Sequence, residues 1–309
     1  MYDYPILMIN VDHKKLLTIL KQKYELNVVD TQQAAGSYSQ TVLFVENDNN
    51  QIFVLKILKD IHREFDLPHH SAQVAFSKFL NTQLSDGFRA VSFVPNIRGE
   101  TITHIDEDDF IVLFQKEEIT KKIQLTHQET KELGSNMRVM HERLVDFSHV
   151  GLRTTDYMRV LSDDQVRQLP TIFPKIVMSE YSPFLKPLNY SALGLSTTVL
   201  HGDLHQENVS FTNRPVLMDL DTLCRGSRIE EIARTITHWH IDVEKIRIFY
   251  KNLLSGYGPL TEIENALLPK LIISQLLRKH FEFVDCSDQE NALRIKKLLP
   301  IFIKAIDTK

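Results

Sequence analysis

The chain has 309 residues, of which 43% are apolar and 25% are charged, which is ordinary for a folded protein of one large or two smaller domains. Its formal net charge of −4 gives no support for binding nucleic acid or an anionic membrane. The two cysteines, Cys224 and Cys286, are far apart, and the N-terminal apolar run is too short for a secretion signal or a membrane span. We therefore expect a cytoplasmic protein, monomeric or homodimeric, with no nucleic-acid or membrane partner.

The first third of the chain predicts a small, mostly antiparallel sheet with one or two helices. Asp12 is the expected cap of a helix whose apolar residues follow helical spacing. Strand-like runs are expected at residues 26–30, 41–46, 51–58, 88–95 and 110–115. The turn at residues 47–50 joins the second and third runs as a hairpin, and residues 67–83 predict a second helix.

Beyond Glu117 the pattern becomes helical. An apolar stripe at i, i+4, i+7 and i+11 predicts a buried amphipathic helix on Leu133, Met137, Met140 and Leu144. Further helices are expected at residues 228–238, 242–254, 262–283 and 288–306. We therefore predict an α+β fold with a sheet lobe over residues 1–116, a helical lobe over residues 117–309, and a ligand between them.

The segment HGDLHQEN concentrates polar side chains in one loop. Asp203 follows a glycine there, and Asn208 lies five residues further on. The short apolar segments 209–211 and 216–218 predict a tight hairpin that returns Asp219 to a place beside Asn208. Amide and carboxylate oxygens suit Mg²⁺ and not zinc, which leaves Asp203 free to receive a proton from a hydroxyl. Each residue alone is an ordinary loop residue, but the joint spacing indicates a site for phosphoryl transfer.

These motifs lead to a known family. The stretch LHGDLHQENVSF…VLMDLD resembles the catalytic core of the aminoglycoside phosphotransferase and choline kinase superfamily, the small-molecule relatives of protein kinases. ELGSNMRVMHERL is similar to the Leu-Gly…Leu-His helix of that family, and GSRIEEIAR to the stretch after its metal-binding Asp. The resemblance implies a two-lobed protein-kinase-like fold, Mg²⁺ as cofactor, and ATP or GTP as co-substrate.

The resemblance also implies roles for single residues. It makes Asp203 the catalytic base, Asn208 and Asp219 the Mg²⁺ ligands, and Lys56 the partner of the α- and β-phosphates. The strand IFVLKIL supports the role of Lys56, because a charge in so apolar a segment needs a partner. The alternative is a lysine on the solvent face of an edge strand.

The helix after that strand departs from the kinase pattern. Gln73 stands where the family usually has a glutamate that pairs with the strand lysine. Its amide can hydrogen-bond Lys56 but cannot neutralise it, and Glu64 is an alternative partner. The departure affects how Lys56 is anchored and leaves the metal site untouched.

Two further segments are expected to contact the nucleotide. AAGSYSQT has one glycine that permits an unusual turn, with backbone amides facing phosphate oxygens. The expected contacts in that loop are Gly36, Ser37, Tyr38 and Ser39. The base is expected to lie against the segment between the lobes, at Phe114, Gln115 and Lys116. A plain hairpin turn is the alternative for the loop.

Histidines near the motifs have several interpretations. His205 approaches the γ-phosphate or stabilises its loop, and His201 is expected to bond backbone carbonyls around the loop. A metal is not expected at His238 and His240, because residues two apart diverge on a helix.

The predicted function is transfer of the γ-phosphoryl group to a hydroxyl of a small metabolite or antibiotic. Residues 150–198, which build the acceptor pocket in such enzymes, carry charges of both signs and leave the acceptor open. One alternative is a nucleotide-binding regulatory protein of the same fold, which Gln73 favours. A protein kinase is the other alternative, opposed by HGDLH with no lysine after Asp203 and by DLD in place of Asp-Phe-Gly.

Overall fold

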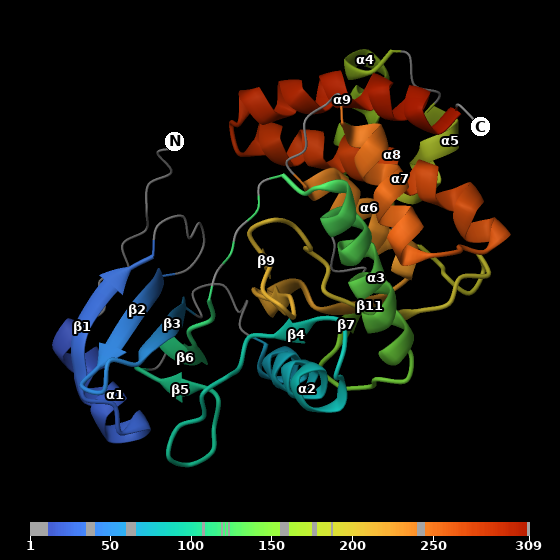
Figure 1. The fold of residues 1–309 in the computed structure, drawn as a ribbon. Helices are drawn as coiled ribbons and strands as arrows, with labels where there is room; N and C mark the ends of the chain where they lie inside the picture. Colours follow the sequence, from blue (N-terminus) through green and yellow to red (C-terminus); the bar gives the residue numbers. More distant parts are fainter. Residues whose placement is uncertain are drawn as a thin grey trace. The chain divides into compact units, whose positions relative to one another are not determined.

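A computed structural model of the chain (Figure 1) describes residues 12–34, 41–59, 66–106, 109–118, 120, 122, 124–154, 161–174, 178–186, 188–239 and 245–307. The chain divides into two units. Unit 1 comprises Met1–Ser85 and Arg89–Ile119, and unit 2 comprises Asp86–Phe88 and Thr120–Lys309. Unit 1 holds the largest sheet and unit 2 most of the helices, so the predicted order of a sheet lobe followed by a helical lobe is confirmed.

The sheet of unit 1 has five antiparallel strands in the order β1-β2-β3-β6-β5. They are β1 (Val28–Gln33), β2 (Thr41–Asn47), β3 (Ile52–Lys59), β5 (Thr103–His104) and β6 (Asp109–Gln115). The predicted hairpin joins β2 to β3. Its turn forms because the Asn47 side-chain oxygen accepts the amides of Asn49 and Gln51 at 3.0 and 2.9 Å. Asn50 in that turn has a φ of 59°, which asparagine tolerates.

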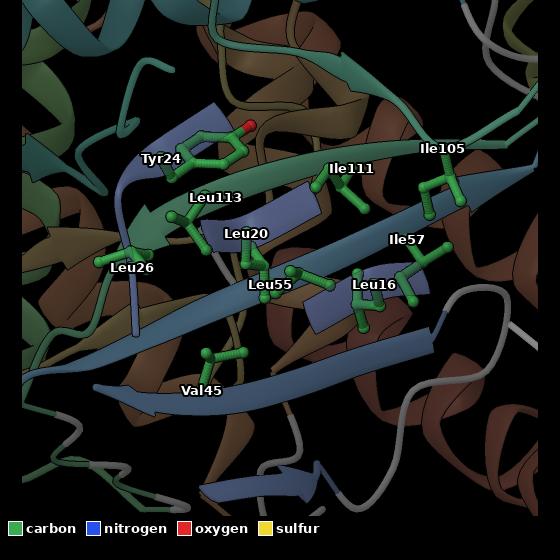
Figure 2. Close-up of a cluster of buried hydrophobic side chains, with 10 residues drawn as sticks. All are labelled: Leu16, Leu20, Tyr24, Leu26, Val45, Leu55, Ile57, Ile105, Ile111 and Leu113. Atoms are coloured by element: carbon green, nitrogen blue, oxygen red, sulfur yellow. The ribbon is translucent and has the colours of Figure 1, made fainter. Parts of the chain in front are cut away.

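Helix α1 (His13–Tyr24) packs against this sheet (Figure 2). Its predicted cap is confirmed, because the Asp12 carboxylate accepts the amide of Lys14 at 2.9 Å. The core that joins helix and sheet consists of Leu16, Leu20, Tyr24, Leu26, Val45, Leu55, Ile57, Ile105, Ile111 and Leu113. Each buried leucine contributes about 1.5–3 kcal/mol, so this apolar contact holds the helix on the sheet.

The strand predicted at residues 88–95 is wrong in extent. The strand found there, β4, covers Arg89–Ala90 alone. Asn81 of α2 (Leu67–Gln83) accepts the amide of Ala90 at 2.9 Å and donates to its carbonyl at 2.9 Å. Beyond β4 the segment makes an isolated bridge from Phe93 to Phe114 of β6, so the predicted run is divided into two short pieces although its composition is typical of a strand.

Unit 2 is built on long helices. They are α3 (His127–Arg143), α6 (Arg228–His238), α7 (Ile246–Tyr257), α8 (Glu262–Asp285) and α9 (Gln289–Asp307), with the shorter α4 (Asp163–Ile172) and α5 (Met178–Tyr181). Figure 1 shows α8 and α9 side by side. Capping boxes of Thr126 with Glu129 and Thr261 with Glu264 begin α3 and α8. Within the described part of the chain, no helix is long and apolar enough to cross a membrane.

Helices α3 and α7 approach each other at glycines. A Cβ atom on Gly134 would lie 2.2 Å from the carbonyl oxygen of Leu253, and one on Gly256 would lie 1.9 Å from that of Lys131. Real side chains do not come so close to a backbone oxygen. The absence of a side chain at these two positions therefore sets the distance between the two helices.

Short strands carry the polar loops of unit 2. β8 (Thr198–Leu200) and β7 (Arg153–Thr154) pair with β11 (Cys224–Gly226) on its two sides. The predicted tight hairpin is confirmed as β9 (Val209–Ser210) paired with β10 (Val216–Leu217). Residues 201–208 connect β8 to β9, so they form a turn held at both ends by strands.

Candidate active site

The β9–β10 hairpin brings two of the predicted residues together. Asn208 immediately precedes β9, and Asp219 follows β10 by one residue. The amide of Met218 donates to the carbonyl of Asn208 at 2.9 Å, which continues the ladder to the base of the hairpin. The positions of Asn208 and Asp219 are therefore neighbours, as the spacing predicts, and their roles as metal ligands stay predictions.

The amide of Asn208 is oriented by the turn that precedes it. Its Nδ2 donates to the backbone oxygen of Asp203 at 2.9 Å and to the carboxylate oxygen Oδ2 of Asp203 at 3.2 Å. Both hydrogens of the NH₂ group are thereby used. The carbonyl oxygen Oδ1 of Asn208 is the group left to act as a ligand.

Among the described residues, three side chains hold the carboxylate of Asp203. His238, the last residue of α6, has its Nδ1 2.7 Å from Oδ1, and His205 has its Nε2 3.2 Å from Oδ2. Asn208 is the third, at Oδ2. Because a carboxylate oxygen only accepts, each imidazole presents an N–H to it. The Asp203 side chain keeps 30% of its surface exposed, so a substrate can reach it.

His205 stabilises its own loop. Its Nδ1 accepts the amide of Glu207 at 3.2 Å, so its proton lies on Nε2 and is donated to Asp203. The 3.1 Å approach of this Nε2 to Nδ2 of Asn208 is a contact between two donors and not a bond. Of the two predicted roles, the loop-stabilising one therefore has a geometric basis.

The charge states at this carboxylate follow from its neighbours. Burial raises the pKa of the Asp203 carboxyl, but the hydrogen bonds from His205 and His238 outweigh burial and hold the pKa well below its usual value. Burial, together with nearby Lys279, lowers the pKa of His238 to about 3. At neutral pH an ionised carboxylate therefore accepts from a neutral imidazole. Ionisation is the state that a proton-accepting group needs.

A second carboxylate supports the turn from beneath. Glu231 of α6 is fully buried and accepts the amides of His201 and Gly202 at 3.1 and 2.6 Å. His141 of α3 donates to it from Nε2 at 2.9 Å, and Tyr257 of α7 donates to the other ring nitrogen at 2.8 Å. The beginning of the turn is thus bound to α6, and through His141 to α3 and α7.

His201 links this turn to the residues before Asp219. Its Nε2 donates to the backbone oxygen of Met218 at 2.8 Å, and its Nδ1 accepts the amide of Asp203 at 3.3 Å. The prediction that His201 bonds a backbone carbonyl is confirmed. Asp219 itself has a φ of 52°, a left-handed conformation that is uncommon outside glycine and that occurs often at functional sites.

Lys56 lies on β3, which is an interior strand of the sheet of unit 1. Its neighbours across the ladder are Val42 and Val112. The alternative of a lysine on an edge strand is therefore excluded. Gln73 lies on α2 and is nearly buried, but among the described residues no hydrogen bond joins it to Lys56.

The segment expected to contact the base ends β6. The amides of Gln115 and Lys116 donate to the carbonyls of Ser92 and Ile52 at 3.0 and 3.3 Å, so neither is open to a base as it stands. The ring of Phe114 packs on Phe93 at a centroid distance of 4.7 Å. The predicted loop contacts Gly36, Ser37, Tyr38 and Ser39, and the alternative partner Glu64, lie outside the described residues.

Comparison with family models decides the family. Residues 30–266 match the model of the phosphotransferase enzyme family, which is more than half of the chain and includes parts of both units. The chain belongs to this phosphotransferase family. The resemblance read from the catalytic motif is thereby confirmed, and so is the enzyme class, a phosphotransferase.

Solved structures show the same fold as this family member. An amicoumacin kinase, hAmiN, solved with AMP-PNP and Ca²⁺, is 16% identical over 95% of this chain and 94% of its own, with a TM-score of 0.73. A spectinomycin phosphotransferase, APH(9)-Ia, is 14% identical over 96% and 94%, with a TM-score of 0.59. Choline kinase LicA from Streptococcus pneumoniae is 12% identical over 96% and 99%, with a TM-score of 0.60. No curated protein sequence matches the chain.

These likenesses confirm the predicted two-lobed protein-kinase-like fold, and at such low identity they show the fold alone. Two residues that bond the turn around Asp203 were not predicted to do so. His238 lies in the motif HWH, which was considered only for a metal, and Glu231 lies in GSRIEEIAR, which was assigned to the family without a role for this side chain. Helical spacing shows which residues share a face but not which loop lies opposite that face.

Proposed function

We propose that this family member is a small-molecule kinase, which transfers the γ-phosphoryl group of ATP or GTP to a hydroxyl of a small metabolite or antibiotic. One observation carries the proposal: Asp203 accepts hydrogen bonds at both oxygens, while the NH₂ group of Asn208 is used in bonding Asp203, which leaves the side-chain oxygen Oδ1 of Asn208 as a ligand at the base of the hairpin that also carries Asp219. A base and a pair of hard oxygen ligands therefore share one turn and one hairpin. This pairing is the arrangement that phosphoryl transfer needs.

The donor atoms fit Mg²⁺. An amide oxygen and a carboxylate are hard ligands, and Mg²⁺ normally takes one or two protein ligands together with phosphate oxygens. Among the described residues no cluster of three or more His, Cys, Asp or Glu side chains is placed to hold a metal. When bound by Asn208 and Asp219, Mg²⁺ neutralises charge on the phosphates.

The chain's own residues supply orientation and proton acceptance. As the acceptor oxygen bonds to the γ-phosphorus, the bond from that phosphorus to the β–γ bridging oxygen breaks, and the nucleoside diphosphate leaves. The proton of the acceptor hydroxyl passes to the Asp203 carboxylate. Little covalent chemistry falls to the protein, so positioning accounts for most of the rate enhancement. In this proposal unit 1 binds the nucleotide, with Lys56 on its phosphates, and unit 2 binds the acceptor.

The relatives of known structure suggest which acceptors to test. Amicoumacin, spectinomycin and choline appear in the names of the similar proteins. We infer that the acceptor here is a compound of this kind, a small molecule that carries a hydroxyl group. The expected setting is the cytoplasm, where nucleoside triphosphates are available and where free thiols such as Cys224 and Cys286 persist.

The test of this function is the substitution Asp203→Asn. With an acceptor found in a panel of amino alcohols, sugars and antibiotics, we expect the turnover number to fall about 100-fold or more. Nucleotide affinity should stay unchanged, because Asp203 is not assigned a contact with the donor. Steady-state kinetics and nucleotide titration measure the two quantities. Asp146→Asn removes a carboxylate from an exposed position of unit 2 and is the matched control.

A regulatory nucleotide-binding protein is the second candidate, and Gln73 favours it, because no acidic side chain stands at that position. Nucleotide binding without phosphoryl transfer to any compound of the panel would support this candidate. Unchanged turnover in Asp203→Asn would remove the base assignment. Phosphate found on a protein substrate would instead indicate a protein kinase.

A further inference from the structure

His238 makes the shortest of the three bonds to the Asp203 carboxylate, and the proposed reaction assigns it no role. Its Nδ1 lies 2.7 Å from Oδ1, whereas His205 and Asn208 both lie 3.2 Å from Oδ2. The neutral imidazole donates from Nδ1, since a carboxylate oxygen only accepts. A short N–H···O⁻ bond is among the stronger hydrogen bonds of proteins.

Counting acceptor positions shows where a substrate can bind. An ionised carboxylate offers about four lone-pair positions, two on each oxygen. His205 and Asn208 take both positions on Oδ2, and His238 takes one on Oδ1. The remaining position is on Oδ1. A hydroxyl that donates to Asp203 therefore does so beside the His238 ring.

The position of the ring is fixed by its neighbour in the chain. Trp239, the residue that follows α6 as its cap, is 2% exposed, and its ring lies 6.0 and 5.9 Å from the ring centroids of Phe211 and Phe249. The imidazole of His238 keeps 18% of its surface exposed. The end of α6 is thus anchored in apolar surroundings, while the imidazole faces the carboxylate.

We propose that His238 is a positioning residue for phosphoryl transfer: its Nδ1–H holds Oδ1 so that the last free lone pair of Asp203 points at the acceptor hydroxyl. The inference rests on the proposed function. Removal of the donor leaves Oδ1 free to turn, so the acceptor oxygen meets the γ-phosphorus in the wrong orientation more often. Misplacement of about 1 Å costs on the order of 100-fold in rate.

The test compares two variants in the hydrolysis of Mg²⁺–ATP. Water accepts the γ-phosphoryl group in this reaction, so no other acceptor has to be identified. His238→Asn retains an N–H near the place of Nδ1, and His238→Leu retains bulk without a donor. We expect His238→Leu to lower kcat about 10- to 100-fold with an unchanged KM for ATP, and His238→Asn to recover most of that loss. Thr237→Val, one residue earlier in α6, is the matched control and should leave kcat unchanged.

A second measurement follows the ring itself. In protein with ¹⁵N-labelled histidine, NMR should show His238 as the neutral Nδ1–H form in the wild type, and Asp203→Ala should remove the downfield signal of the bonded proton. Equal kcat in the wild type and His238→Leu, equal loss in both variants, or a proton on Nε2 would each overturn the inference. Loss of kcat in step with melting temperature across all variants, Thr237→Val included, would also overturn it in favour of a structural role.

Failure of the proposed function has a different outcome. Wild-type protein that neither binds nor hydrolyses Mg²⁺–ATP or Mg²⁺–GTP would remove the function and with it any positioning role. Wild-type turnover that is insensitive to the donor at position 238 would leave the function in place and remove the inference alone.

Discussion

The buried carboxylate of Glu231 holds the backbone of the turn that carries Asp203. Glu231 is fully buried and accepts two backbone amides of the turn at residues 201–208 and one imidazole. Burial raises the pKa of its carboxyl, but the hydrogen bonds from His141 and from the amide of Gly202 outweigh burial and keep the pKa below its usual value of 4.5. The ionised form is therefore the one that the fold stabilises.

We expect Glu231→Gln to reduce the free energy of unfolding by about 2–4 kcal/mol, because one of the buried donors then faces an NH₂ group. The folded-state pKa lies below the unfolded-state value, so the contribution of this carboxylate is complete above pH 4.5. It is lost as the pH falls through the folded-state pKa. Urea unfolding of both proteins between pH 7 and pH 3 measures the difference and its decline.

The exposed Glu132→Gln on α3 is the control, with an expected change within about 0.5 kcal/mol. A Glu231→Gln protein as stable as the wild type at pH 7 would contradict this account.

Spatial proximity could be predicted from the sequence for residues that are close together in the chain. The hairpin between Asn208 and Asp219 is encoded by two short apolar runs and a turn, so their proximity follows from the sequence. The bond from His238 to Asp203 crosses 35 residues and depends on how α6 packs, which no local pattern records. The same holds for His141 and Glu231, 90 residues apart.

The beginnings of α1 and α6 were predicted closely, and the extent of the strand at residues 88–95 was not. Asp12 begins α1 as expected, and α6 has the predicted bounds, because capping and amphipathic spacing are local properties. The run at residues 88–95 has strand composition, yet it forms the two-residue β4, whose Ala90 is bonded by Asn81 of α2, and an isolated bridge from Phe93 to Phe114. Tertiary contacts of this kind override β-propensity.

The close contact of α3 with α7 predicts that a side chain at Gly256 destabilises the protein. Alanine is normally the better helix residue, by about 1 kcal/mol over glycine. In Gly256→Ala, however, the new Cβ would lie 1.9 Å from the Lys131 carbonyl oxygen, so the helices must separate. We expect a loss of about 3 kcal/mol or more in the free energy of unfolding, measured by thermal or urea denaturation.

The exposed neighbour Ser255→Ala is the matched control on the same helix, with an expected effect within about 0.5 kcal/mol. Stabilisation by Gly256→Ala would show that α3 and α7 are further apart than the structure places them.

For the whole molecule, the change from period-two to helical patterning near residue 117 was enough to predict a sheet lobe followed by a helical lobe. The family match over residues 30–266 spans that change. Fold class depends on many residues at once, so single errors such as the overlong strand at residues 88–95 do not alter it. In the proposed function, the identity of the acceptor depends on a few side chains in unit 2, and the hydrophobic pattern does not reveal their chemistry.

We predict that stabilisation of the folded protein by nucleotide depends on Mg²⁺. A nucleotide that binds the folded protein stabilises it by about 2.7 kcal/mol at 100 times its Kd. We expect ADP with Mg²⁺ to raise the melting temperature, and EDTA to remove most of that rise. Asp219→Asn should lose the Mg²⁺-dependent part, since a neutral amide replaces the carboxylate. Mg²⁺ without nucleotide is the control, and a rise that EDTA leaves intact would contradict the metal assignment.

The left-handed backbone of Asp219 limits which residues can replace it without straining the chain. Asparagine shares with aspartate the tolerance for positive φ, whereas alanine or glutamate at a φ of 52° would strain the chain. A single-base change converts an aspartate codon into an asparagine codon. Under the proposed role of Asp219 as a metal ligand, a folded protein without activity is therefore one mutation away, because this change removes the carboxylate without straining the backbone.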